Sequence, residues 1–126
     1  MANKLILIIE DNDKNRKLIR EVLQVKGYQT IESETAEEGL KLAEEKTPAL
    51  ILMDIQLPGM DGITAMKQLK AASKTNSIPI VAITASAMTH SRQTMLAEGF
   101  DGYQTKPLNL KEFLAELERL IAKKVV

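Results

Sequence analysis

Three short apolar runs, separated by stretches with helical patterning, constrain the fold of this chain more than any other feature. They are LILII (5–9), ALILM (49–53) and IPIVAI (78–83). Runs that are apolar at every position are typical of strands covered by helices on both faces, because neither face meets water. Two more polar stretches, YQTIES (28–33) and DGYQT (101–105), fit the edges of the same sheet.

Helical patterns fill the intervals between these strands and follow the last one. We expect helices over about 13–26, from about 35, over about 62–72, over about 86–98, and from about 110 onward. The resulting five βα units predict a single α/β domain spanning residues 1–126. Because strand–helix–strand crossovers are right-handed, we expect a doubly wound, five-stranded parallel sheet of flavodoxin-like (βα)5 type in the order 2-1-3-4-5.

The composition excludes several classes of protein. The 17 Lys and Arg balance 17 Asp and Glu, which argues against a general binder of nucleic acid or membrane surfaces. The absence of Cys excludes disulfides, thiolate metal sites and Cys nucleophiles. The apolar runs are too short for membrane insertion, and the N-terminus lacks the pattern of a signal peptide. We therefore expect a cytoplasmic protein.

Polar side chains gather where the predicted strands end. Glu10 and Asp11 follow the first strand, Asp54 the third, Thr84 the fourth and Lys106 the fifth. Parallel strands bring these positions to one edge of the sheet, near the point where the strand order reverses. Two carboxylates ~4 Å apart repel by about 4 kcal/mol at an effective dielectric of 20, so three of them need a cation or a proton. Oxygen ligands alone favour a hard ion such as Mg²⁺.

The sequence resembles the receiver domain of two-component response regulators over its whole length, from Leu5 to the last predicted helix. The matching motifs, in chain order, are the Glu10-Asp11 pair, LMDIQLPGMDG (52–62), the Thr84-Ala85 step and Tyr103-x-x-Lys106-Pro107.

The resemblance implies a phosphoryl-acceptor site. Asp54 would receive a phosphoryl group from the phosphohistidine of a sensor histidine kinase or phosphotransfer protein. Mg²⁺ would be bound by Asp11, Asp54 and the backbone carbonyl of Gln56, with Glu10 contributing directly or through water.

The resemblance implies that the remaining motif residues respond to phosphorylation of Asp54. Thr84 would hydrogen-bond the phosphoryl oxygens and Lys106 would pair with one of them. Tyr103 would be the aromatic switch that follows Thr84, and the Lys106–Pro107 bond is implied to be cis. His90, the only histidine, is expected to be a solvated residue of the fourth helix.

The chain ends about twenty residues after Lys106, without a DNA-binding or catalytic output domain. We expect a stand-alone regulator of the chemotaxis or cell-division type, which catalyses only its own phosphoryl transfer and dephosphorylation and is otherwise no enzyme. Its downstream target would be a protein that binds the face formed by the fourth helix, fifth strand and fifth helix.

Three alternatives share parts of this pattern. A phosphatase with an Asp nucleophile would want a second acid two residues after Asp54, where this chain has Gln56. A pseudo-receiver, acting as an interaction module without phosphorylation, is expected to have lost one of the acidic residues or Lys106. A flavodoxin-like cofactor binder would need a phosphate-cradling Gly loop after the first strand, and there is none.

Overall fold

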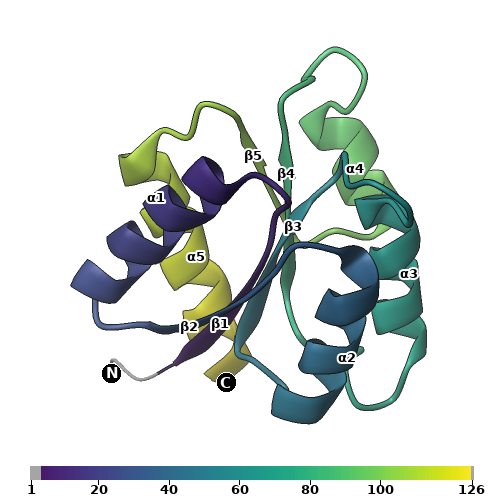
Figure 1. Cartoon of the computed structure of the whole chain (residues 1–126), viewed down its shortest axis with the longest axis horizontal. Helices are drawn as coiled ribbons and strands as arrows, with labels where there is room; N and C mark the ends of the chain where they lie inside the picture. Colours follow the sequence, from purple (N-terminus) through teal and green to yellow (C-terminus); the bar gives the residue numbers. More distant parts are fainter. Residues whose placement is uncertain (1–3, 126) are drawn as a thin grey trace.

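A computed structural model describes residues 4–125, in which five strands alternate with five helices (Figure 1). The strands are β1 (Leu5–Ile9), β2 (Gln29–Ser33), β3 (Leu50–Asp54), β4 (Ile80–Thr84) and β5 (Gly102–Thr105). The helices are α1 (Asp13–Val25), α2 (Ala36–Lys46), α3 (Gly62–Ala71), α4 (Arg92–Glu98) and α5 (Leu110–Val125). All neighbouring strands pair in parallel, in the order β2-β1-β3-β4-β5. The predicted fold class and strand order are confirmed.

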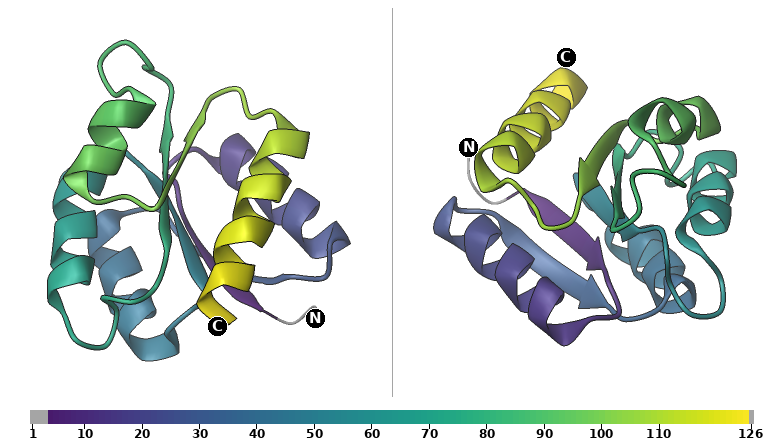
Figure 2. Two further views of the ribbon diagram at one scale, coloured as in Figure 1. Left: turned by 180° about the vertical axis from the view of Figure 1, so that it is seen from behind. Right: turned by 90° about the horizontal axis from the view of Figure 1, so that it is seen from above.

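The helices form one layer on each side of the sheet. Helices α1 and α5 cover one face, and α2, α3 and α4 cover the other (Figures 1 and 2). Alternate residues of β1 accordingly enter two separate cores: Ile6 and Ile8 pack toward α1 and α5, whereas Leu7 and Ile9 pack toward the opposite layer. This explains why the three central strands are apolar at nearly every position. No helix within residues 4–125 is long and apolar enough to cross a membrane.

Helix α4 begins later than the sequence pattern predicts. We expected it from about residue 86, but it starts at Arg92, and residues 87–89 form a turn. Ser91 is its N-cap, because its hydroxyl accepts a hydrogen bond from the Thr94 N–H at 3.2 Å. The expected first turns have nothing to bury, since the Met88 side chain is wholly exposed. A helical segment without buried apolar contacts gains too little to offset its ordering cost.

Candidate functional site

Three carboxylates meet at the C-terminal edge of the sheet. Glu10 directly follows β1, Asp11 begins the turn into α1, and Asp54 is the last residue of β3. One oxygen from each lies within 4.8 Å of the others. Glu10 and Asp54 are buried, whereas Asp11 is exposed. The parallel ladder between β1 and β3 therefore converges these acids, as the sequence predicts.

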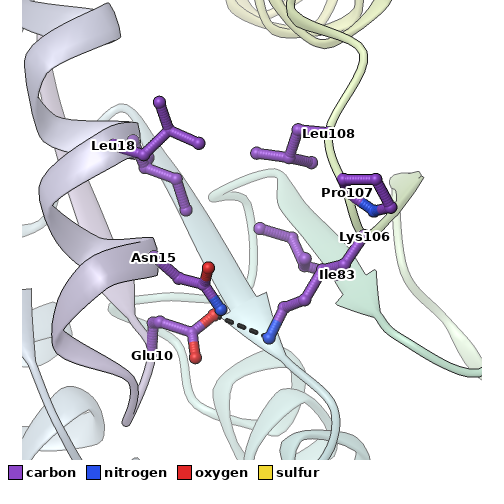
Figure 3. Close-up of a pocket in the computed structure, with 8 residues that line it drawn as sticks. Glu10, Asn15, Leu18, Ile83, Lys106, Pro107 and Leu108 are labelled. Atoms are coloured by element: carbon purple, nitrogen blue, oxygen red, sulfur yellow. Dashed lines mark ion pairs between the residues drawn. The ribbon is translucent and has the colours of Figure 1, made fainter.

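Lys106 brings the compensating positive charge to this cluster from the turn after β5. Its ammonium lies 2.9 Å from Glu10 Oε1 and 3.2 Å from Asp54 Oδ2. Figure 3 shows the Lys106 side chain pointing toward Glu10 across the space between α1 and the segment that leads into α5. One ammonium thus neutralises part of the charge of two buried carboxylates at once.

Burial and neighbouring charge change the protonation of this pair. Burial raises the pKa of Glu10 from 4.5 to about 7, and the nearby Asp54 carboxylate adds to the rise, although the adjacent Lys106 ammonium opposes it. Burial lowers the pKa of Lys106, but the Glu10 and Asp54 carboxylates outweigh that effect and the net pKa is raised. Lys106 is therefore charged at neutral pH, and Glu10 keeps its proton to a higher pH than a solvated carboxyl group does.

The donor set fits a Mg²⁺ ion. Glu10 Oε1 is buried and, although it lies close to the Lys106 ammonium, accepts no hydrogen bond of normal geometry among the described residues. The Asp11 side chain forms neither a hydrogen bond nor an ion pair within the part of the chain that the structure describes, so its oxygens are available. A cluster of oxygen ligands without nitrogen or sulfur is the environment that hard divalent ions prefer.

The backbone around Asp54 fixes the direction of its carboxylate. The Gln56 N–H donates a hydrogen bond of 3.0 Å to Asp54 Oδ1, while Oδ2 faces Lys106. The predicted Gln56 ligand lies two residues from Asp54 at this edge, and its side chain is exposed. Gly62, at the start of α3, packs against the carbonyl of Asp54, where a Cβ would approach that oxygen to 2.4 Å. The two carboxylate oxygens of Asp54 therefore have different neighbours: the Gln56 N–H contacts Oδ1 and the Lys106 ammonium contacts Oδ2.

Thr84 and Tyr103 lie on adjacent strands beside this cluster. Thr84 ends β4 and is fully buried, and its hydroxyl oxygen accepts a hydrogen bond from the Ser86 N–H at 3.0 Å. Tyr103 on β5 is also buried, and its hydroxyl donates to the His90 carbonyl oxygen at 2.6 Å. The Tyr103 hydroxyl therefore ties the end of the turn between β4 and α4, at His90, to β5.

His90 is not the solvated helix residue that we expected. It precedes α4, is half-buried, and its Nδ1 is buried without a hydrogen-bond partner in the described chain. The late start of α4 explains the difference, because the turn folds back onto Tyr103 instead of extending the helix into solvent.

The Lys106–Pro107 peptide bond is cis, the isomer that the resemblance implies. Beyond it, a cavity of about 110 Å³ separates α1 from the β5–α5 connection. Leu18, Pro107 and Leu108 form its apolar walls, and Glu10 and Lys106 lie at its inner end (Figure 3).

The structure adds Arg16 to the environment of the site. Sequence reasoning did not single it out, because an arginine near the start of a helix has no signal that distinguishes it from a solvated one. Its side chain is only 12% exposed and its guanidinium donates to the Glu10 carbonyl oxygen at 2.8 Å.

The structure thus combines a doubly wound parallel sheet of order 2-1-3-4-5 with an acidic cluster that faces a lysine at the C-terminal edge of the sheet. The model of the response regulator receiver domain matches residues 6–118, and the chain belongs to this family.

Curated relatives and solved structures agree with that assignment. The polar-differentiation response regulator DivK of Brucella ovis is 38% identical over 115 residues, covering 91% of this chain and 94% of DivK. The receiver domain of sensor histidine kinase PA1611 from Pseudomonas aeruginosa, solved with a magnesium ion in its active-site cleft, is 32% identical with a TM-score of 0.88. That comparison covers 96% of this chain and 99% of the other. The chemotaxis protein CheY4 of Vibrio cholerae is 26% identical with a TM-score of 0.85, over 94% of this chain and 99% of CheY4.

Proposed function

We propose that this chain is a stand-alone response regulator in which Asp54 accepts a phosphoryl group in a Mg²⁺-dependent reaction. The observation that carries the proposal is the pairing of one Asp54 oxygen with the Lys106 ammonium at 3.2 Å, beside two further carboxylates. The similarity to the response regulator DivK, which extends over 94% of that protein, supports the proposal, and the absence of Cys is compatible with a cytoplasmic location.

The phosphoryl donor is a sensor histidine kinase or a phosphotransfer protein. An Asp54 carboxylate oxygen forms the new P–O bond while the P–N bond of the donor's phosphohistidine breaks, and the imidazole leaves with that electron pair. Glu10, Asp11, Asp54 and the Gln56 carbonyl would hold Mg²⁺, which supplies positive charge for the phosphoryl oxygens. Lys106 would add positive charge beside the same oxygens, and its two ion pairs already position it at Asp54.

Phosphorylation is read out through Thr84 and Tyr103. A phosphoryl group on Asp54 adds acceptor oxygens for the Thr84 O–H, which draw the Thr84 hydroxyl away from its present position, where its oxygen accepts from the Ser86 N–H. Movement of Thr84 changes the space beside Tyr103, whose hydroxyl bond to His90 fixes the turn before α4. The electrostatic change is local, and a packing element with two arrangements transmits it.

The surface that changes is the α4–β5–α5 face, and a downstream protein binds there. Arg92 of α4 lies 5.3 Å from the centroid of the Tyr103 ring and donates to the Tyr103 carbonyl oxygen at 3.1 Å. It also pairs at 3.5 Å with Glu116 of α5, which accepts from the Tyr103 N–H. Tyr103 thus contacts a residue of each helix of that face, Arg92 of α4 and Glu116 of α5.

Intact mass after incubation with acetyl phosphate tests the acceptor role. The wild-type protein should gain one phosphoryl group only in the presence of Mg²⁺, and Asp54→Asn should gain none. A folded wild-type protein that gains no mass under any condition would instead be a pseudo-receiver. A gain that survives in Asp54→Asn would show that the nucleophile is another residue.

A further inference from the structure

The turn between β1 and α1 carries both Glu10 and Asp11, yet the two side chains are restrained very differently. Glu10 is buried, and its Oε2 accepts a hydrogen bond from the Asn12 N–H at 3.2 Å. Asp11 is exposed and its carboxylate has no partner among residues 4–125. The direction of the Asp11 carboxylate therefore depends on the backbone that precedes it, namely the Glu10–Asp11 peptide group.

The carbonyl oxygen of that peptide group accepts no hydrogen bond from the neighbouring strand. The Glu10 N–H still bonds to the Ser33 carbonyl at 3.0 Å, as the last donor of the β1–β2 ladder. The next donor along β2 would be the Thr35 N–H, but it bonds to Ser33 Oγ at 3.3 Å instead. The Glu10 carbonyl oxygen is consequently left without a strand partner at the position where the metal-binding turn begins.

Arg16 takes the place of this missing ladder donor. Its Nη1 donates to the Glu10 carbonyl oxygen at 2.8 Å, from the end of the first turn of α1. The rest of the guanidinium is fixed by acids on both sides: Nε lies 3.3 Å from Glu32 Oε1 on β2, and Nη2 bonds to Asp13 Oδ1. Only a planar group with several donors can contact the carbonyl and both carboxylates at once.

We propose that Arg16 is a positioning residue, whose guanidinium fixes the Glu10–Asp11 peptide against β2 and thereby aims the Asp11 carboxylate into the metal site. This inference rests on the proposed function, because it gives the acidic cluster the role of binding Mg²⁺. Supports behind metal ligands commonly change metal affinity by 10–100-fold when they are removed.

The sign of the effect separates positioning from simple electrostatics. Arg16 is a cation near the site, and its loss would leave Asp13 unpaired and Glu32 paired with Arg20 alone. Electrostatics alone would therefore make Arg16→Met bind Mg²⁺ more tightly, since the local potential becomes more negative. If Arg16 positions the turn, the same substitution weakens Mg²⁺ binding.

Arg20 offers a matched control on the same helix. Its Nη1 lies 2.6 Å from Glu32 Oε2, but it makes no contact with the Glu10 carbonyl among the described residues. Arg20→Met removes an arginine and an ion pair to Glu32, as Arg16→Met does, without touching the β1–α1 turn. Arg16→Lys keeps the charge and loses the planar group.

Titration calorimetry with Mg²⁺ on the full chain, with folding checked by circular dichroism, measures the effect. We expect Arg16→Met to weaken Mg²⁺ binding about tenfold and Arg16→Lys severalfold, with Arg20→Met within twofold of wild type. Phosphorylation of Arg16→Met by acetyl phosphate should need proportionally more Mg²⁺ but reach within about threefold of the wild-type rate at saturation, as expected for a lost positioning group.

Mg²⁺ binding by Arg16→Met as tight as wild type, or tighter, would overturn the proposal. So would equal weakening in Arg20→Met, or a saturated phosphorylation rate that falls while Mg²⁺ affinity is unchanged. If Arg16→Met does not fold, Arg16→Lys decides: wild-type affinity in that variant would refute a role for the planar group. Failure of the proposed function itself gives a different result, in which the wild-type protein neither binds Mg²⁺ nor gains a phosphoryl group.

Discussion

The ammonium of Lys106 lies 3.2 Å from the carboxylate of Asp54, although 52 positions separate the two residues in the chain. The same ammonium contacts Glu10 at 2.9 Å. The cation thus joins the ends of β1 and β3 to the turn after β5, and the chemistry at Asp54 depends on that bridge.

Removal of the Lys106 charge should slow phosphorylation without abolishing it. Lys106→Met takes away a preorganised cation from the developing charge on the phosphoryl oxygens, and a loss of about 100-fold in rate is expected. Phosphorylation rates with acetyl phosphate at saturating Mg²⁺ measure it. Lys70→Met is the control, because Lys70 forms a comparable ion pair with Asp101 at 2.7 Å away from the site. Equal rates in the two variants would contradict the assigned role of Lys106.

The raised pKa of Glu10, about 7, predicts a pH dependence of stability in metal-free protein. Burial disfavours the charged form in the folded state, so the contribution of Glu10 is most favourable below pH 4.5 and is lost as the pH rises through about 7. The stability of Glu10→Gln relative to wild type should therefore rise between pH 5 and pH 8, by a few kcal/mol at about 1.4 kcal/mol per pKa unit. Urea unfolding in the presence of a chelator measures the difference. A difference that stays constant over this range would show that burial does not raise the pKa.

Mg²⁺ should reduce this pH dependence in the wild-type protein, because a bound cation favours the Glu10 carboxylate. The same urea titrations with saturating Mg²⁺ provide the comparison. Persistence of the full pH dependence would argue that Glu10 does not face the ion.

Loss of the Thr84 hydroxyl should separate phosphorylation from its readout. Thr84→Ala leaves Asp54 and its charged neighbours in place, so Mg²⁺-dependent addition of one phosphoryl group should persist. The amide shifts of β5 and α4 that follow phosphorylation should shrink to a fraction of their wild-type size in NMR spectra. Thr75→Ala, which removes another buried hydroxyl, bonded to the Leu69 carbonyl at 2.7 Å, is the control. Wild-type shift changes in Thr84→Ala would refute the proposed switch.

The start of α3 should tolerate no side chain. A Cβ on Gly62 would lie 2.4 Å from the Asp54 carbonyl oxygen and 2.9 Å from Ile55 Cα, which are backbone atoms of the site. Gly62→Ala should cost about 3 kcal/mol in free energy of unfolding and slow Asp54 phosphorylation, because the backbone must shift. Gly39→Ala places its Cβ against the end of the Ile9 side chain, which can rotate, and should cost less. Urea unfolding of both variants tests this ranking, and a reversed ranking would contradict it.

Much of the fold could be predicted because its signals are local. The continuous apolar runs of β1, β3 and β4 are a direct consequence of helices on both faces, and the polar runs of β2 and β5 follow from their edge positions. The start of α5 is equally local, since Asn109 Oδ1 accepts from the Glu112 N–H at 3.1 Å, as a capping pattern requires. The predicted start of α4 was wrong, because Tyr103 on β5 stabilises a turn at His90 where the pattern predicted helix.

The order of residues along the chain was enough to predict which polar residues follow the strands. It therefore predicted that one edge of the sheet carries Glu10, Asp11, Asp54, Thr84 and Lys106. Parallel pairing makes that conclusion independent of side-chain detail. Three features became visible only in the folded structure: the Lys106 ammonium bridges two carboxylates, His90 is half-buried, and Arg16 replaces a ladder donor at Glu10. These contacts form because elements that are distant in the chain restrict the conformations of long side chains. A pattern of neighbouring residues carries no information about that restriction.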